Sequence, residues 1–321
     1  MMKFFVILGL LLILSSAQAQ SRIPRVGILV QDLGRAQSQA IKGLTAELKT
    51  LGYSERKNLF VETRNAKDDR SALQTFANDL AHKQATVIFT VGTRASLAAV
   101  AASREVPIVF VHPGDPATVG IMKNSPDSAR NITGVAAYAA GTTEKRLELL
   151  KEILPALTTI HVFFDANSAL SRENLVLAES AAKHLAVQLR PHGVKSIDAL
   201  RSTLSNLNSQ TGEAIYQISD DLVESEADFI FATARKKRLP SMFNEESWAI
   251  RGATAAYGPS YLAMGHDAAH LVDQIIKGRP PASLPIARAT KFDLTINYRG
   301  ATLIGLQLSR ELLNKADLVI R

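Results

Sequence analysis

The chain has 321 residues, of which 46% are hydrophobic and 21% charged, a composition ordinary for a globular protein with a full core. Its net charge of +7, from 37 basic and 30 acidic residues, is too mild to indicate a nucleic-acid partner. The absence of cysteine excludes disulfides, thiolate metal sites, a catalytic thiol and a lipid-modified cysteine.

The first 19 residues have the pattern of a signal peptide. Lys3 supplies a positive charge, residues 4–14 are an unbroken apolar run, and Ala17-Gln18-Ala19 is a small-x-small cleavage site. The apolar run is far shorter than the roughly 20 residues that cross a bilayer. We therefore expect cleavage of residues 1–19 and a periplasmic product without a lipid anchor. The roughly 300 residues that follow suggest two domains.

From residue 25 onward, short apolar runs alternate with longer amphipathic ones, which is typical of βαβ units and parallel sheets. The first half is predicted to contain strands at 25–30, 59–63, 86–91 and 108–111 and helices at 38–51, 70–83 and 94–103. A second series follows residues 131–135, with predicted helices at 143–154, 171–185 and 197–207 and strands at 159–164, 187–190 and 214–218. The sequence thus predicts two consecutive α/β halves of comparable length.

Residues 227–232 are ambiguous, because their apolar content also fits a buried strand. Helical spacing is shown by Val223, Ala227, Ile230, Phe231 and Ala234. We therefore predict one helix over 222–237, and we interpret its basic end, 235–238, as a solvated helix terminus and not a nucleic-acid site. The remaining predicted elements are strands at 240–243 and 253–256, a helix at 261–277 and an extended segment at 291–297.

Polar residues follow the predicted strand that ends at residue 91. In open parallel sheets, ligands bind beyond the carboxyl ends of the strands, where loops lead into helices. The residues in this place are Gly92, Thr93, Arg94 and Ser96. A glycine lets a ligand approach the backbone, and hydroxyls beside unpaired N–H groups suit a carboxylate. The alternative is that Thr93 only caps its own helix.

A second polar loop, Ser219-Asp220-Asp221, follows the predicted strand that ends at residue 218, with Glu224 placed for a capping box. Either aspartate could be only a cap. Two successive carboxylates exceed what capping needs, so one is predicted to accept a ligand ammonium group. Together the two loops predict a zwitterionic ligand such as an amino acid. We expect alanine at Asp220, or at Thr93 and Ser96 together, to weaken ligand binding without unfolding the protein.

Further candidate ligand residues are individually weak, because Asp-Pro is first a turn signal and a lone tyrosine usually packs. They are Gln31, Asp32, Asp115, Tyr138, Asp165, Asn167 and Tyr257.

Motifs of catalysis are missing from the sequence: it has no G-x-S-x-G elbow, no G-x-G-x-x-G, no Walker loop and no cysteine nucleophile. We therefore expect neither an enzyme nor a cofactor. His266 and His270 stand one helical turn apart, where a metal could bridge them. Because the segment lacks the glutamate of H-E-x-x-H and an evident third ligand, we interpret it as helix surface and expect no metal site.

Several short segments occur in a specific order and spacing. They include Leu51-Gly52-Tyr53, Gly114-Asp115-Pro116, Asn131-Ile132-Thr133-Gly134, Ser219-Asp220, Tyr257-Gly258-Pro259-Ser260, Ile276-Lys277-Gly278 and Ile296-Asn297. From residue 25 to the C-terminus, the chain in these respects resembles the ABC-transporter substrate-binding family with the type I periplasmic binding protein fold. That group includes aromatic amino-acid binders. One departure is at residues 127–130, where the family usually shows Pro-Gly-Gly.

The resemblance implies an α/β protein of two Rossmann-like lobes with parallel sheets, the Venus-flytrap architecture. Lobe 1 is expected to comprise residues 20–137 plus 259–287, and lobe 2 residues 138–258 plus 288–321. The chain would cross between the lobes three times, with the helix at 261–277 returning to lobe 1 and the tail ending on lobe 2.

The implied mechanism is that a small organic solute contacts both lobes and stabilises a hinge-closed state, which the permease of an ABC importer recognises. We expect a monomer without a nucleic-acid partner. Two alternatives stay open: a sensor accessory that presents ligand to a signalling receptor, and an exported hydrolase.

Overall fold

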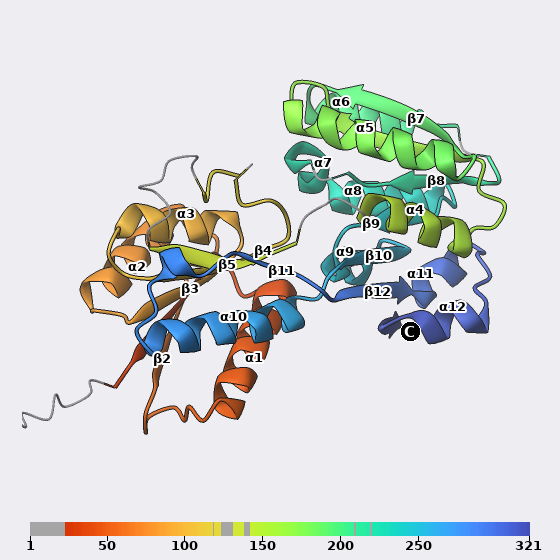
Figure 1. Cartoon of the computed structure of the whole chain (residues 1–321). Coiled ribbons are helices and arrows are strands. Elements are labelled where there is room, and N and C mark those ends of the chain that lie inside the picture. The colour runs from red at the N-terminus through yellow and green to blue at the C-terminus, as the bar shows by residue number, and fades with distance from the viewer. Residues whose placement is uncertain (1–22, 118, 123–130, 138–141, 209, 219) are drawn as a thin grey trace, which may run out of the picture.

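The computed structural model describes residues 23–117, 119–122, 131–137, 142–208, 210–218 and 220–321. Figure 1 shows two lobes side by side, each built on a sheet with helices on both faces. Within these ranges, no helix is both long and apolar enough to cross a membrane. The expected signal peptide, Tyr138 and Ser219 lie outside the described residues.

The sheet of lobe 1 has the order β11-β5-β4-β3-β1-β2, and every neighbouring pair is parallel. Its strands are β1 (Arg25–Val30), β2 (Phe60–Asn65), β3 (Val87–Val91), β4 (Ile108–His112), β5 (Ile132–Ala136) and β11 (Ala287–Arg288). β3, β4 and β5 are buried along their whole length, as parallel strands covered on both faces should be.

Helices on the two faces of this sheet enclose separate hydrophobic cores. α1 (Arg35–Thr50) and α10 (Tyr261–Ile276) share one core, where Leu44 packs with Val272. α2 (Arg70–His82) and α3 (Thr93–Ala102) share the other. Each fully buried leucine or valine of this kind stabilises the fold by roughly 1.5–3 kcal/mol.

The sheet of lobe 2 has the order β13-β12-β10-β9-β8-β6-β7, and only the β10–β12 pair is antiparallel among the described strands. Its strands are β6 (Thr159–Asp165), β7 (Gln188–Val194), β8 (Glu213–Tyr216), β9 (Ser241–Phe243), β10 (Ala255–Pro259), β12 (Phe292–Asn297) and β13 (Leu318–Ile320).

Helices cover both faces of this sheet. α4 (Thr142–Ile153) and α5 (Ala169–His184) pack on one face. α6 (Ile197–Ser205) and α8 (Ala227–Lys236) pack on the other.

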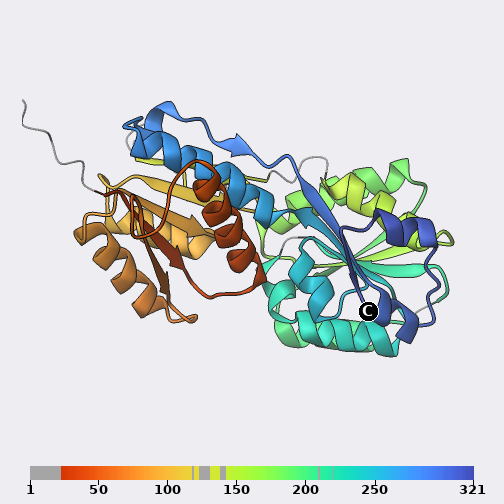
Figure 2. The same ribbon diagram turned by 90° about the horizontal axis from the view of Figure 1, so that it is seen from below.

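The chain passes between the two sheets three times, as the resemblance implies. It leaves lobe 1 after β5, returns between β10 and α10, and crosses again between β11 and β12. Figure 2 shows the last passage running from one lobe to the other beside α10. α10 therefore follows a strand of lobe 2 but packs against α1 of lobe 1.

Some predicted elements differ from the structure. The helix predicted over 222–237 is two helices, α7 (Asp221–Ser225) and α8, with a break at Glu226. The Glu226 carboxylate is held by Arg201 through two hydrogen bonds of 2.7 and 3.1 Å. β7 continues through Pro191 to Val194, which its place at the edge of the sheet permits.

Short helices were not predicted, because six residues or fewer show less than two turns of helical periodicity. They are α9 (Glu246–Arg251), the 3-10 turn at Pro281–Ser283, α11 (Tyr298–Leu303) and α12 (Arg310–Lys315). The strands β11 and β13, of two and three residues, are too short to show alternation and were not predicted either.

Candidate functional site

Two contacts join the lobes near the carboxyl ends of strands. Arg35, at the start of α1, forms an ion pair with Glu246 of α9. The Tyr261 hydroxyl, at the start of α10, donates to Glu245 at 3.1 Å. The carboxyl ends of β1 in lobe 1 and β9 in lobe 2 thus lie against each other, which is where ligands of open parallel sheets bind.

Thr93 of lobe 1 is supported from behind by His112. Gly92, with φ of +87°, turns the chain from β3 into α3 and puts Thr93 at the first helical position. The Thr93 Oγ1 lies 2.9 Å from His112 Nε2, while the Gly114 N–H donates to His112 Nδ1 at 3.0 Å.

Nδ1 of His112 also lies 3.0 Å from the Gly114 carbonyl oxygen, so the ring can accept from the Gly114 N–H or donate to the Gly114 carbonyl. Burial lowers the pKa of His112, which keeps the ring neutral at pH 7. In the tautomer that accepts from the Gly114 N–H, Nε2–H donates to Thr93, and the Thr93 hydroxyl keeps its own hydrogen for a ligand.

Ser96 turns inward and does not share this arrangement. Its hydroxyl is fully buried, donates to the Gly92 carbonyl at 2.7 Å and lies 2.8 Å from Thr90 Oγ1. Ser96 therefore holds the loop in shape from within the lobe. Arg94, by contrast, is exposed at the start of α3.

Carboxylates lie on lobe 1 as well, at the ends of β1 and β2. The Gln31 amide donates to Asp68 Oδ1 at 2.7 Å. Partial burial, and then the negative charge of Asp68, raise the pKa of Asp32. A cation placed beside these two aspartates would reduce that repulsion. Asp115 is exposed and closes a turn by accepting from the Ala117 N–H.

Asp220 of lobe 2 is buried and bonded to backbone on both sides. It caps α7, since its Oδ1 accepts from the Val223 N–H at 3.0 Å. Its Oδ2 accepts from the Asp165 N–H at 2.7 Å, which joins the ends of β6 and β8. Only 5% of the residue is exposed. Each oxygen still has a second lone pair for another donor. Beside it, Asp165 closes a turn with the N–H of exposed Asn167.

Sequence reasoning missed two residues at this edge of the sheets, His112 and Glu245. His112 is the last residue of β4, and Glu245 follows β9 by two residues. The strand-end rule that selected Thr93 and Asp220 could have found both. Burial raises the pKa of Glu245, and burial and the neighbouring Glu245 raise that of Tyr261 well above its ordinary value.

Comparison with known proteins places the chain in a family. Residues 25–320 match the family described as ABC transporter substrate binding protein. The chain belongs to this family of ABC transporter substrate-binding proteins. Its members bind small molecules, are not enzymes, are typically extracytoplasmic and work with ABC transporter permeases. The predicted family and the expectation of a protein without enzymatic activity are confirmed.

Individual relatives of this substrate-binding protein are distant in sequence. A tyrosine-binding protein of Clostridioides difficile is 23% identical over 259 residues, which cover 81% of this chain and 74% of that one. A conserved domain protein from Vibrio cholerae is 25% identical, with a TM-score of 0.74, over 93% of this chain and 100% of the other.

An ABC domain from Streptococcus pneumonia in complex with L-Trp is 19% identical, with a TM-score of 0.74 and the same coverage of 93% and 100%. These likenesses confirm the predicted fold class of two α/β lobes with mostly parallel sheets.

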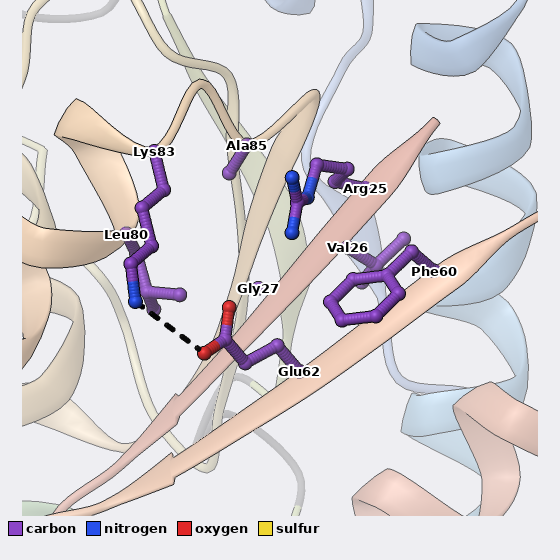
Figure 3. A pocket seen from close by; sticks show the side chains of 8 residues that line it. All are labelled: Arg25, Val26, Gly27, Phe60, Glu62, Leu80, Lys83 and Ala85. Atoms are coloured by element: carbon purple, nitrogen blue, oxygen red, sulfur yellow. Dashed lines mark ion pairs between the residues drawn. The ribbon is translucent and has the colours of Figure 1, made fainter. Parts of the chain in front are cut away.

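Three other features of the substrate-binding protein are the predicted residue Tyr257, a small hollow and a polar cluster. Tyr257, near the carboxyl end of β10, stacks on Phe292 of β12 with ring centroids 5.9 Å apart. The hollow in Figure 3 lies at the amino-terminal ends of β1 and β2, between Arg25, Phe60 and Lys83. Its volume of about 10 Å³ has room for no more than one water.

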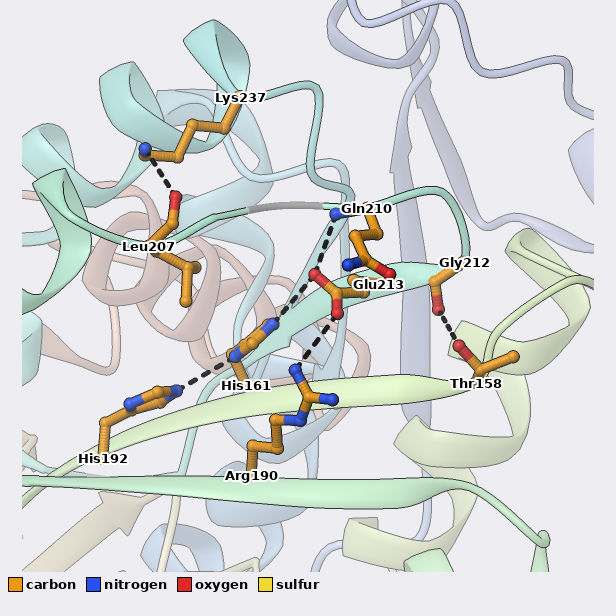
Figure 4. Close-up of polar contacts among 9 residues, drawn as sticks. All are labelled: Thr158, His161, Arg190, His192, Leu207, Gln210, Gly212, Glu213 and Lys237. Carbon is orange, nitrogen blue, oxygen red and sulfur yellow. Dashed lines mark hydrogen bonds and ion pairs between the residues drawn. The ribbon is translucent and has the colours of Figure 1, made fainter.

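The third feature is a polar cluster near the amino-terminal ends of β6 and β8, formed by His161, His192, Arg190 and Glu213 (Figure 4). His161 lies 3.0 Å from His192 and 3.3 Å from Glu213. Burial alone would raise the pKa of Glu213, but the Gln210 N–H, His161 and Arg190 lower it overall. This cluster lies at the opposite end of the strands from Asp220.

Proposed function

We propose that this substrate-binding protein carries an amino acid, with an aromatic one as first candidate, from the periplasm to the permease of an ABC importer. The ligand would lie between the lobes, with its carboxylate on lobe 1 and its ammonium group on lobe 2. The observation that carries the proposal is the hydrogen-bond chain from Gly114 through His112 to Thr93.

The carboxylate end follows from that chain. In the proposed site His112 donates from Nε2, so that the Thr93 hydroxyl keeps its own hydrogen to donate at the first turn of α3. The first N–H groups of a helix lack intrahelical acceptors and carry partial positive charge, so they favour an anion at the same place. A neutral His112 provides this orientation without adding a competing charge.

The ammonium end has one buried and one partly buried carboxylate available on the opposite lobe, Asp220 and Glu245. Asp220 has lone pairs beyond its two backbone partners, and Glu245 accepts from Tyr261 beside it. An ammonium group there would make charge-assisted hydrogen bonds and favour the ionised form of Glu245. The tyrosine-binding relative and the tryptophan-bound structure support an aromatic amino acid as the solute.

Export and delivery complete the proposal. The pattern of Lys3, the apolar run and Ala17-Gln18-Ala19 supports secretion with cleavage of residues 1–19. The three passages between the lobes would act as the hinge that closes on the ligand, and the permease would recognise the closed state.

Calorimetric titration of the mature protein with L-tyrosine, L-tryptophan and L-phenylalanine tests the proposal. Tyramine, which lacks the carboxylate, and N-acetyl-L-tyrosine, which lacks the ammonium group, should bind far more weakly. A thermal-shift screen of all the common L-amino acids extends the search, since a ligand at 100 times its Kd adds about 2.7 kcal/mol of stability. If no amino acid binds in either assay, the proposal is wrong.

Thr93→Val is the matched variant for the carboxylate contact. A hydrogen bond to a charged group contributes about 1.5–3 kcal/mol, so affinity should fall roughly 10- to 100-fold. Thr75→Val on the surface of α2, where the hydroxyl only bonds back to the Ser71 carbonyl, is the control and should bind normally. Equal affinity of the two variants would remove Thr93 from the site.

A further inference from the structure

We infer that Glu47, His266 and His270 form a binding site for a divalent transition-metal ion, with Zn²⁺ as the expected occupant. The histidine pair lacks an evident third ligand in the sequence, but the structure provides one from α1. This site is independent of the proposed amino-acid function, because it uses none of the strand-end residues.

The third ligand comes from an unusually close approach of two helices. A Cβ atom on Gly43 of α1 would lie 2.0 Å from the Leu262 carbonyl oxygen of α10. A Cβ atom on Gly265 of α10 would likewise lie 2.0 Å from the Ala40 carbonyl oxygen of α1. The two glycines therefore let the backbones touch. Glu47, one turn beyond Gly43, is thereby brought against the histidine face of α10.

The three side chains present their donor atoms to one another. His266 Nε2 lies 2.9 Å from Glu47 Oε2, and His270 Nε2 lies 3.2 Å from Glu47 Oε1. One donor atom from each residue can be chosen so that all lie within 4.8 Å of one another. Ligands about 2.1 Å from a tetrahedral zinc are separated by roughly 3.4 Å, so small side-chain rotations would accommodate the ion.

The donor set selects the kind of ion. Two imidazoles and a carboxylate suit Zn²⁺ and related ions such as Ni²⁺ and Cu²⁺, whereas Mg²⁺ and Ca²⁺ prefer oxygen ligands alone. The remaining coordination position faces solvent, since the His266 and His270 side chains are 50% and 48% exposed. Asp267 Oδ1 lies 3.6 Å from His266 Nδ1, where a ligating histidine usually has an outer carboxylate.

The nearby carboxylate of Asp273 already has other partners and is not a further metal ligand. Asp273, one turn beyond His270, accepts from the Tyr53 hydroxyl at 2.9 Å and from Lys277 at 2.8 Å. Glu47 itself is only 9% exposed and is held at the helix crossing. A bound ion would join α1 to α10, the helix that enters lobe 1 directly from lobe 2, and so stabilise lobe 1 away from the strand-end residues.

The test is calorimetric titration of ZnCl₂ into metal-stripped, untagged protein at pH 7.5, because a polyhistidine tag would bind the ion itself. We expect one high-affinity ion per chain, no comparable binding of MgCl₂, and an increase in Tm with ZnCl₂. His270→Ala should weaken binding by at least about 100-fold, and Glu47→Gln by at least about tenfold.

His184→Ala is the matched control, because His184 is also a surface helix residue facing a glutamate, with Nδ1 3.7 Å from Glu144. It should bind Zn²⁺ like the wild type. Two results would overturn the inference: wild-type protein that does not bind Zn²⁺, or Zn²⁺ affinity and Tm shift that are the same in His270→Ala and Glu47→Gln as in the wild type. Glutamine has the same shape as glutamate, so Glu47→Gln should fold normally. Its result therefore tests the site even if His270→Ala, which removes a whole ring, were to fold poorly.

Discussion

The strand-end loops before α3 and α7 look alike in sequence but use their polar side chains in opposite ways. In lobe 1, Ser96 bonds to the Gly92 carbonyl and contacts Thr90, while Thr93 contacts the ring of His112. In lobe 2, Asp220 is itself the acceptor for the N–H groups of Val223 and Asp165. Thr93 therefore bonds to a side chain, whereas Asp220 bonds to the backbone and can offer a ligand only its remaining lone pairs.

This difference predicts that substitution of Thr93 mainly affects ligand binding, whereas substitution of Asp220 also affects the stability of the fold. Thr93 contacts a side chain, His112, so removing its hydroxyl takes no acceptor from a backbone N–H group and costs only the contact with the ring. Asp220 joins two backbone segments inside lobe 2, so its removal affects folding whatever its role toward a ligand. The expectation that alanine at Asp220 leaves the fold intact must therefore be revised.

Asp220→Ala is expected to have the largest effect. A buried N–H group of Val223 and a partly buried one of Asp165 lose their acceptor, at about 1–3 kcal/mol each, so unfolding free energy should fall by roughly 2–6 kcal/mol in urea denaturation. Thr93→Val takes one partner from the His112 ring and should cost less, about 1–2 kcal/mol. If Asp220→Ala were as stable as the wild type and bound ligand poorly, Asp220 would be a ligand residue only and the contrast between the loops would fail.

Ser96→Ala sharpens the comparison within lobe 1. The variant loses a buried hydroxyl that bonds to Gly92 and Thr90, which should reduce unfolding free energy by about 1–2 kcal/mol. Ligand affinity should change by less than about threefold, in contrast to Thr93→Val. Calorimetry and urea denaturation of both single variants provide the measurement. An affinity loss in Ser96→Ala as large as in Thr93→Val would show that the loop acts as one unit.

The elements that define the fold were predictable because their signals are local. The strand at 25–30 was predicted with its observed bounds from an apolar run, and α2 begins at Arg70 as predicted, with Asp69 capping its first turn. The break between α7 and α8 was not predictable, because Arg201, which holds Glu226, comes from another helix.

The candidate site could be predicted only as far as the strand-end rule reaches. That rule placed Thr93 and Asp220 beyond the carboxyl ends of strands, where the structure has them, but the partners of each hydroxyl and carboxylate depend on contacts between elements. The contact of Glu47 with the histidines could not be predicted from the sequence for the same reason. Its approach to His266 depends on two glycines more than 200 residues apart in the chain, Gly43 and Gly265.

The smallest expected effect concerns pH and the polar cluster of lobe 2 (Figure 4). Burial lowers the pKa of both His161 and His192, and for His161 it outweighs the raising effect of Glu213. The unfolded chain therefore takes up protons first as pH falls, so the contribution of these rings to stability is full above about pH 7 and is lost as pH falls through about 6.5 and below. Glu213, whose pKa is lowered, adds a loss of the same sign at still lower pH.

His192→Gln should reduce this decline, because one of the two rings that resist protonation, partly buried His192, is gone. The urea midpoint measured at pH 7.5 and 5.5 should then fall less between the two conditions than in the wild type. His82→Gln, at the exposed end of α2, is the control and should leave the decline unchanged. Because His112 in lobe 1 has a pKa lowered by burial too, part of the decline should remain in His192→Gln. An unaltered decline in that variant would show that His192 does not contribute to the pH dependence.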